Sequence, residues 1–460
     1  MGINPSIFKS YDIRGIYPTE INEENLPQII TAIYAFFKKK LGKDNFTLVL
    51  GNDMRVSSPS LTEVAKKVLV ELGATVIDVG MLSTPTFYFA VSHYGYDAGI
   101  QITASHNPKE YNGVKYVMKG ENGLIKIGKS TGMDDVKQMA IDGVTLEKPG
   151  NGTITPKSGV GDDEVNNALN FVNNPVVKKF KIAADPANAM GGTYIDALAK
   201  KMPMDLVRMN FELDGTFPVH QPDPLQAKNL VDLQKKVVEV KADLGLAPDG
   251  DGDRLFFIDE KGQVIPPTII TSIVAKELLK VYPGAEILVD IRYIFTPKKI
   301  IEENGGKMGI TKVGHAFITE EMNKTGAVFA GESSAHYYFK ATGNAESQLP
   351  TIITVLKVLT EENCTMSELV EKIRRSYESG EFNYKVSNAQ EILDAIKNKY
   401  TDGELSTLDG VAVSYSDWRF GVRTSNTEPL LRLNVESYDK ATMEAKRDEL
   451  MALIKSLAKE

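Results

Sequence analysis

Apolar strand-like runs alternate with helical patterns along this chain, and this alternation constrains the fold more than any other feature. Residues 45–51 (NFTLVLG) form a short apolar run that ends in glycine, which is typical of a buried strand. Residues 61–73 carry apolar side chains at helical spacing, and residues 74–80 read as the next strand. This order favours a sheet covered by helices on both faces. We therefore expect an α/β protein.

The same pattern recurs along the chain and predicts several units. At roughly 150 residues per domain, 460 residues correspond to about three domains. Residues 147–163 are rich in Gly, Pro, Ser and Thr and are interpreted as a linker. A strand-like stretch at 181–192 opens a second α/β unit, and a third starts near Gly262. Residues 379–386 mark the entry to a last, smaller unit that ends in a helix.

Charge and cysteine content exclude some classes of protein. The chain has 53 Lys and Arg against 61 Asp and Glu, a net charge of −8, which on average repels nucleic acid and anionic membranes. A single cysteine, Cys364, rules out an internal disulfide and fits a reducing compartment. The N-terminal residues lack the apolar core of a signal peptide, and no run of 18 apolar residues occurs. We expect a soluble, cytoplasmic protein.

The loop from Thr103 to Pro108 is the first candidate for chemistry. It follows an apolar strand-like run, and function in α/β folds concentrates in loops at the carboxyl ends of strands. Ser105 is a candidate nucleophile, with His106 and Lys115 nearby to handle protons and phosphate charge. The alternative is an ordinary turn, since Ser, Asn and Pro are common turn residues. The loop lacks the GxSxG spacing of a hydrolase elbow.

The segment DGDGDR, residues 249–254, predicts a metal site. Asp249, Asp251 and Asp253 alternate with glycine, so their carboxylates can converge on one hard cation. An EF-hand loop would need glycine where Arg254 stands and a helix where a strand-like LFFID follows. We therefore reject the EF-hand and keep the metal, with a solvated acidic turn as the alternative. Three protein oxygens leave room for a phosphate oxygen, which suits Mg²⁺.

Two further polar loops follow strand-like runs. In residues 331–336 (GESSAH), Glu332 and Ser334 can hydrogen-bond sugar hydroxyls, although any polar strand end can have this composition. In residues 423–429 (RTSNTEP), Arg423 offers a planar fork that matches phosphate. The hydroxyl and amide groups that follow it resemble an anion-binding nest, with a capped turn as the alternative.

Together these loops resemble the α-D-phosphohexomutase family, in particular its phosphomannomutase/phosphoglucomutase branch. The motifs SYDIRG, GNDMRVSS, TASHNPKEYNGVK, DGDGDR, KVGHAF, GESSAH and RTSNTEP occur in the family's order over nearly the whole chain. The resemblance implies three related α/β domains with mixed sheets sandwiched by helices and a smaller α+β C-terminal domain, around a central cleft. The implied domains are 1–150, 151–260, 261–372 and 373–460. In this order they carry the loop with Ser105, the metal loop, the sugar loop (331–336) and the loop 423–429, which binds the phosphate that does not react (the distal phosphate).

The resemblance also implies an activity. Members transfer phosphate between C1 and C6 of a hexose through a phosphorylated serine, here Ser105, with a hexose 1,6-bisphosphate as intermediate and activator. Mg²⁺ is the implied cofactor. The implied partner is a small phosphosugar rather than nucleic acid or membrane, and members are monomers or dimers.

Roles carry over only onto matching positions. The implied metal ligands are Ser105 through its phosphate, Asp249, Asp251 and Asp253. The implied catalytic residues are Ser105, Lys115, His315 and Arg254, with Lys115 and His315 handling protons. The implied substrate-binding residues are Tyr11, Arg14, Arg292, Glu332, Ser334, His336, Arg423, Ser425, Asn426 and Thr427.

Two alternatives to this activity stay open. The sugar loop departs from the common GEMSGH form at Ser333 and Ala335 while keeping the Glu-x-Ser-x-His frame. It looks more like phosphomannomutase-type members than phosphoglucosamine mutases, but it does not distinguish mannose from glucose. A phosphoglucosamine mutase is therefore the first alternative, and a non-catalytic protein that binds metal or phosphosugar is the second.

Overall fold

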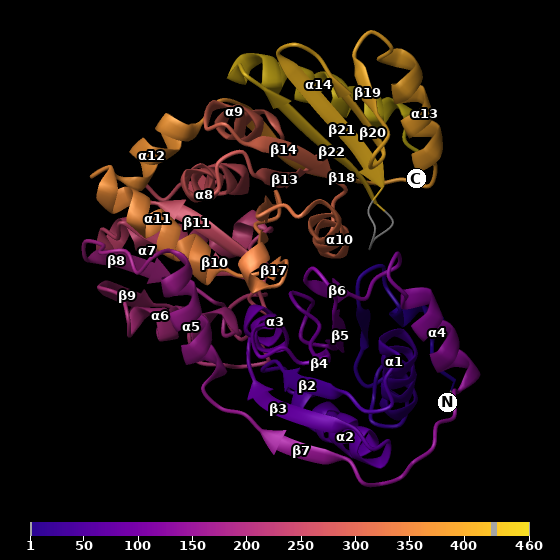
Figure 1. Ribbon diagram of the computed structural model, residues 1–460. Coiled ribbons are helices and arrows are strands. Elements are labelled where there is room, and N and C mark those ends of the chain that lie inside the picture. Colours follow the sequence, from indigo (N-terminus) through magenta and orange to yellow (C-terminus); the bar gives the residue numbers. More distant parts are fainter. Residues whose placement is uncertain (1, 425–429, 460) are drawn as a thin grey trace. The chain divides into compact units, whose positions relative to one another are not determined.

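Two units make up residues 2–424 and 430–459, which this computed structural model describes (Figure 1). Unit 1 contains the chain as far as Ile265 together with His336–Ser367. Unit 2 contains Pro266–Ala335 and the chain from Glu368 onwards. Each unit is built from mixed or antiparallel sheets and helices, so the α/β class predicted from the alternation of patterns is confirmed.

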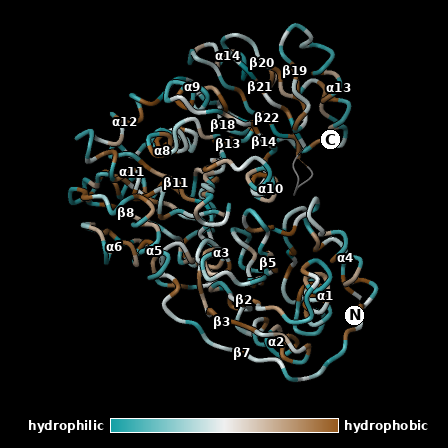
Figure 2. The backbone as a smooth tube through the Cα atoms, in the orientation of Figure 1, coloured by the Kyte–Doolittle hydropathy of each residue, from teal (hydrophilic) through white to brown (hydrophobic). Residues whose placement is uncertain are grey.

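A seven-stranded mixed sheet begins unit 1, with the strand order β1-β5-β4-β2-β3-β7 and β6 beside β5. Its strands β4, β2, β3 and β7 run parallel, whereas β5 is antiparallel to β4 and β1 is antiparallel to β5. The strands are β1 (Ile13–Ile16), β2 (Thr47–Asn52), β3 (Thr75–Met81), β4 (Ala98–Ile102), β5 (Tyr111–Lys119), β6 (Leu124–Lys126) and β7 (Thr153–Pro156). In Figure 2 brown, hydrophobic stretches are visible near β2 and β3.

Four helices belong to this sheet: α1 (Leu26–Leu41), α2 (Ser58–Glu71), α3 (Thr84–His93) and α4 (Met133–Asp142). Helix α1 shows why they form, because Ile29, Ile33 and Phe37 recur at helical spacing and are fully buried. It ends at Gly42, whose left-handed backbone is the usual stop for a helix. The apolar faces of α1, α2 and α4 form one hydrophobic core with the sheet, and α3 packs in a second cluster with residues of β2 and β5.

The predicted linker at 147–163 is partly wrong. Strand β7 lies within it and pairs in parallel with β3, and helix α5 (Val160–Phe171) begins before its end. Thr153, Ile154 and Thr155 are β-branched and favour extended backbone. Pro156 at the end of this strand is tolerated because β7 is at the sheet edge.

A second, five-stranded sheet in unit 1 has the order β12-β11-β10-β8-β9. Its strands are β8 (Phe180–Ala184), β9 (Met204–Arg208), β10 (Leu244–Pro248), β11 (Leu255–Asp259) and β12 (Val264–Ile265), with helices α6 (Gly191–Ala199) and α7 (Val231–Val240). Strands β8, β9 and β10 are parallel, and β11 turns back antiparallel to β10. The chain later returns to unit 1 with strands β16 (Tyr337–Phe339) and β17 (Ala345–Glu346) and helix α11 (Leu349–Glu361).

Unit 2 begins with three parallel strands, β13 (Glu286–Asp290), β14 (Lys307–Thr311) and β15 (Phe329–Gly331). Its helices here are α8 (Pro267–Val281), α9 (Phe295–Glu303) and α10 (His315–Thr325). Helix α12 (Met366–Ile373) leads into the last part of the chain. Strand β13 is buried from Ile287 to Asp290, as expected for a strand with neighbours on both sides.

An antiparallel sheet of order β18-β22-β21-β20-β19 completes unit 2. Its strands are β18 (Tyr377–Lys385), β19 (Glu404–Ser406), β20 (Val411–Ser414), β21 (Trp418–Thr424) and β22 (Leu430–Ser437), with helices α13 (Ala389–Lys399) and α14 (Lys440–Leu457). Trp418 packs in the core of this sheet with Tyr400 and Phe420. This is the α+β arrangement expected for the C-terminal part.

Among the helices described here, none combines the length and the apolar character needed to cross a membrane.

Candidate active site

The serine loop joins β4 to β5 and holds Ser105 in a strained conformation. Ser105 has a φ of +52°, a left-handed backbone that is uncommon for a residue with a side chain. Its N–H donates to Thr103 Oγ1 at 3.0 Å, and its Oγ lies 3.1 Å from His106 Nδ1. Burial and the cations of Arg254 and Arg14 lower the pKa of His106 well below its usual value. The lowered pKa favours the neutral imidazole, and Nδ1 lies within hydrogen-bond distance of Ser105 Oγ.

Arg55 fixes this loop in place. Its guanidinium is fully buried and donates to the backbone carbonyls of Pro108 (2.8 Å), Tyr111 (2.9 Å), Ser105 (2.8 Å) and Asn107 (2.7 Å). Its Nε also lies 3.2 Å from Asp53 Oδ2. One side chain thus binds four carbonyls around the serine, which accounts for the tolerated backbone strain.

The metal loop joins β10 to β11 and lies directly against the serine loop. A Cβ at Gly250 would lie 2.3 Å from the Ser105 carbonyl oxygen, so only glycine allows the two loops this close. Asp249, Asp251 and Asp253 are buried, and each keeps one carboxylate oxygen without a hydrogen-bond partner. Oxygens of the three residues lie within 4.8 Å of one another. Buried, converging carboxylates with spare oxygens are the donor set of a hard divalent cation.

Lys115 on β5 lies between two of these carboxylates. Its Nζ is 2.5 Å from Asp251 Oδ2 and 2.6 Å from Asp253 Oδ2. Burial would lower the pKa of Lys115, but the two carboxylates raise it well above its usual value. Burial would raise the pKa of Asp253, but Lys115 and His336 hold it well below its usual range. For Asp249, burial and the two neighbouring carboxylates raise the pKa.

Asp251 also ties the metal loop to helix α3. Thr84 Oγ1 donates to Asp251 Oδ2 at 2.6 Å, and the Thr84 N–H donates to the Asp251 carbonyl at 2.8 Å. Thr84 Oγ1 lies 3.0 Å from Gln101 Oε1 on β4. These contacts join the first and second sheets of unit 1 at the site itself.

Arg254, His336 and Arg14 complete the group in unit 1. His336 Nε2 lies 3.3 Å from Asp253 Oδ1, and the Nε of Arg254 lies 3.4 Å from the same His336 nitrogen. Arg254 Nη1 is buried and makes no hydrogen bond, and it lies 3.8 Å from Asp223 Oδ1. Arg14 donates to Asp12 at 2.8 Å and to Asn107 of the serine loop at 2.6 Å. Tyr11, three residues before Arg14, is half-buried.

The predicted sugar residues of unit 2 gather around Arg292. This side chain donates to Asp290 at 2.9 Å, to Glu332 at 3.1 Å and to Ser334 at 3.3 Å. Burial would lower its pKa, but Asp290 and Glu332 raise it. Glu332 and Ser334 therefore present oxygens that are fixed by one cation. His315 is the first residue of α10.

Arg423 lies on β21 in the last sheet of unit 2. Its Nη2 is 3.0 Å from Glu381 Oε2, and Glu381 Oε1 is 3.1 Å from Arg432 Nη1. The other predicted residues of this loop, Ser425, Asn426 and Thr427, lie outside the described residues.

The sequence reasoning missed Arg55, Thr84, Glu381 and Arg432. Only Arg55 had a signal, since a charged residue directly after a buried strand, in GNDMRVSS, needs a partner. The structure places Ser105, the three aspartates, Lys115, Arg254, His336 and Arg14 in unit 1, and His315, Arg292, Glu332, Ser334 and Arg423 in unit 2.

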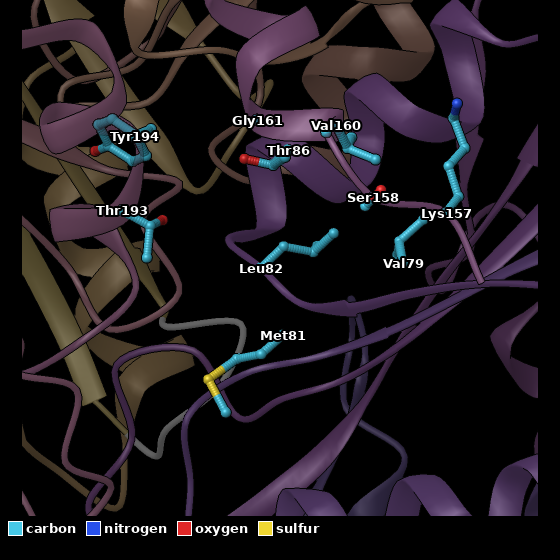
Figure 3. Close-up of a pocket in the computed structure, with 11 residues that line it drawn as sticks. Val79, Met81, Leu82, Thr86, Lys157, Ser158, Val160, Gly161, Thr193 and Tyr194 are labelled. Atoms are coloured by element: carbon cyan, nitrogen blue, oxygen red, sulfur yellow. The ribbon is translucent and has the colours of Figure 1, made fainter. Parts of the chain in front are cut away.

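A hollow of about 200 Å³ also opens in unit 1 at the start of α5 (Figure 3). Thr193 and Tyr194 lie on one side of it, and Val79 and Lys157 lie on the other. It contains none of the predicted site residues. The Tyr194 ring packs against Gly252 of the metal loop, where a Cβ would lie 3.0 Å from it.

Comparisons with known proteins identify the family. Profiles described as phosphoglucomutase/phosphomannomutase match residues 5–131 (alpha/beta/alpha domain I), 154–262 (domain II), 266–377 (domain III) and 381–453 (C-terminal domain). A phosphomannomutase of Vibrio cholerae serotype O1 is 35% identical over 460 residues, with 98% of each chain covered. A phosphomannomutase of Methanocaldococcus jannaschii is also 35% identical, again over 98% of each chain.

A solved structure agrees with these sequence matches. The phosphoglucomutase/phosphomannomutase family protein of Burkholderia thailandensis superposes with a TM-score of 0.87 at 30% identity. The match covers 99% of this chain and 98% of that chain. With full-length relatives above 30% identity and four consecutive domain matches, this chain belongs to the phosphoglucomutase/phosphomannomutase family of phosphohexomutases.

Proposed function

We propose that this phosphohexomutase moves phosphate between C1 and C6 of a hexose, mannose phosphate first and glucose phosphate second, through a phosphorylated Ser105. The observation that carries the proposal is the set of buried, converging carboxylates of Asp249, Asp251 and Asp253 next to the serine loop, each with one oxygen that makes no hydrogen bond. The preference for mannose rests on the names of the relatives.

The three aspartates would hold Mg²⁺, together with an oxygen of the Ser105 phosphate. Their hard oxygens and their number fit this ion, which binds few protein ligands and keeps phosphate as another. When bound, the ion would withdraw charge from the phosphate and so favour its transfer.

The first transfer breaks the bond between Ser105 Oγ and phosphorus and forms a bond from phosphorus to the free hydroxyl of the sugar phosphate. The hydroxyl proton would leave through His315, or through Lys115 after the Lys115 ammonium has passed a proton to Ser105 Oγ, and in either case Ser105 Oγ regains a proton. Arg254 would bind the moving phosphate through its Nη1, which makes no hydrogen bond to the protein. The product, a hexose 1,6-bisphosphate, then presents its other phosphate to Ser105, and added bisphosphate activates the enzyme by phosphorylating this serine.

The remaining residues would hold the substrate. Glu332 and Ser334, fixed by Arg292, would bind sugar hydroxyls together with His336. Arg423, Ser425, Asn426 and Thr427 would hold the phosphate that does not react, and Tyr11 and Arg14 would contact the substrate. We also propose that the functional domains end near residues 150, 260 and 372.

The test is phosphorus NMR of the protein with Mg²⁺, a trace of glucose 1,6-bisphosphate and either mannose 1-phosphate or glucose 1-phosphate. We expect a 6-phosphate signal with both sugars, and faster conversion of mannose. Conversion of glucosamine 1-phosphate faster than either would instead make the protein a phosphoglucosamine mutase.

The mechanism has its own test. Mass spectrometry after treatment with glucose 1,6-bisphosphate should find phosphate on the peptide that contains Ser105, and Ser105→Ala should lose nearly all turnover. Near-normal turnover by Ser105→Ala would rule out the phosphoserine route, even if the NMR experiment shows a mutase.

A further inference from the structure

Arg423 and Arg432 stand directly opposite each other on strands β21 and β22. Like charges at directly paired positions of an antiparallel sheet repel and destabilise the pair. Both side chains are largely buried, with 4% of the Arg423 side chain and 20% of the Arg432 side chain exposed. Arg423 Nε is buried and has no hydrogen-bond partner. Two guanidiniums held together in this way form an anion site.

The anion that fills this site now is Glu381. Its two carboxylate oxygens are divided between the two arginines, at 3.0 Å from Arg423 Nη2 and 3.1 Å from Arg432 Nη1. A third guanidinium, that of Arg292, lies 3.9 Å from Glu381 Oε2 but is already paired with Asp290 and Glu332. One carboxylate therefore contacts both guanidiniums.

Local backbone irregularity directs Glu381 at the arginines. Strand β18 pairs with β22, and the register shifts between Glu378 and Glu381. Gly380, within this shift, has a φ of +77°. Irregularities of this kind reorient the side chain that follows. The Glu381 side chain is 24% exposed, so it can leave the arginines for solvent at a modest cost.

We infer that Arg432 is a second guanidinium of the distal-phosphate site and that Glu381 competes with the substrate phosphate for Arg423 and Arg432. A phosphate oxygen pair matches the two guanidiniums in the same way as the carboxylate does. Glu381 is thus a positioning residue that lowers the affinity for the distal phosphate and speeds its release. This inference rests on the proposed function, because a mutase must let go of one phosphate before it can bind the other.

The test measures binding of mannose 1-phosphate to the Mg²⁺-loaded full-length protein by calorimetry, with Ser105→Ala throughout to prevent turnover. Glu381→Gln keeps the size of the side chain and removes its charge. We expect it to tighten binding about tenfold, because the phosphate no longer displaces the charged Glu381 carboxylate from the two arginines. Glu404→Gln, on the exposed edge strand β19, changes the net charge equally and serves as the matched control that leaves affinity unchanged.

Arginine variants separate the possible outcomes. Arg423→Ala and Arg432→Ala should each weaken binding about tenfold, and Glu381→Gln should lose most of its effect in the Arg432→Ala background. Unchanged binding in Arg423→Ala would remove the distal-phosphate role from the proposed function. Weaker binding in Arg423→Ala, but equal or weaker binding in Glu381→Gln, would overturn only the competition.

Kinetics of the protein with Ser105 intact give a readout that a folding defect would not produce. Glu381→Gln should lower KM and also lower kcat, because the phosphate is held more tightly while the bisphosphate must turn over. A raised KM would overturn the inference.

Discussion

Replacing Arg55 by alanine tests whether the strained serine loop depends on one side chain. The substitution removes four hydrogen bonds to carbonyls of the loop and leaves Asp53 Oδ2 without its ion pair. At about 1.5–3 kcal/mol for each hydrogen bond from a charged donor, four bonds set an upper limit of roughly 6–12 kcal/mol. Water will enter the space and replace some of these hydrogen bonds. The free energy of unfolding should therefore fall by about 3–5 kcal/mol, as for other broken buried ion pairs.

This loss has two measurable consequences. In calorimetry, unit 1 should melt roughly 6–20 °C lower, at about 2–4 °C per kcal/mol for a domain of this size. In the mutase assay, kcat should fall by about 100-fold even below the melting temperature, because a displacement of Ser105 by about 1 Å has an effect of that order. Arg55→Lys keeps the charge but not the planar guanidinium, so its melting temperature and its kcat should lie between those of Arg55→Ala and those of the natural protein.

The control is Arg208→Ala, which removes an exposed ion pair to Asp196 on the surface of unit 1. It should change stability by less than about 1 kcal/mol and leave turnover intact. If Arg55→Ala melts within about 2 °C of the natural protein and retains its turnover, Arg55 does not hold the serine loop in place.

Three further predictions follow from buried groups. Burial raises the pKa of Glu164 to about 7, although a hydrogen bond from Thr86 lowers it. Between about pH 4.5 and pH 7 the folded protein therefore keeps a proton on Glu164, whereas the unfolded chain has lost it. Stability should therefore fall by about 3 kcal/mol as the pH rises from about 4.5 to 7 and then level off, and Glu164→Gln should flatten this part of a urea-unfolding series. Tyr194→Phe removes a buried hydroxyl that has no partner and should raise the free energy of unfolding by about 1 kcal/mol; a loss of stability would reveal a partner. Chelation with EDTA should abolish mutase activity and Mg²⁺ should restore it, whereas full activity in EDTA would exclude the proposed metal role.

The fold class and the main loops could be predicted because their signals are local. Each α/β layer repeats apolar runs and helical spacing within about 30 residues, and Ser105 and the three aspartates follow such runs directly. The linker was misjudged for the same reason, because β7 is exposed along its whole length and pairs with β3, whose partner residues lie 78 positions earlier, as in Thr75 and Thr153.

The residues that were missed act over long distances in the sequence. Arg55 binds carbonyls that lie 50 to 56 positions later, and a backbone carbonyl has no signature in the amino-acid sequence. Glu381 contacts Arg423, which lies 42 positions later in the sequence. This contact depends on a register shift in β18 that the pattern of residue types does not predict. Interactions of this kind become visible only when the sheets are assembled.

Unit 1 is interrupted in the sequence by Pro266–Ala335, and this interruption sets an order on its folding during synthesis. The Asp253 carbonyl accepts a hydrogen bond from Gln348 at 2.6 Å, and the buried Lys126 pairs with Glu346. Both partners lie beyond the interruption, so at about 5–20 residues per second the ribosome delivers them several seconds after the aspartates. Until then Lys126 lacks the carboxylate of Glu346, and the metal loop lacks its hydrogen bond from Gln348. A ribosome that stalls within Pro266–Ala335 would therefore leave a chain that has Ser105 and the three aspartates of the metal loop, yet lacks the contacts that secure them.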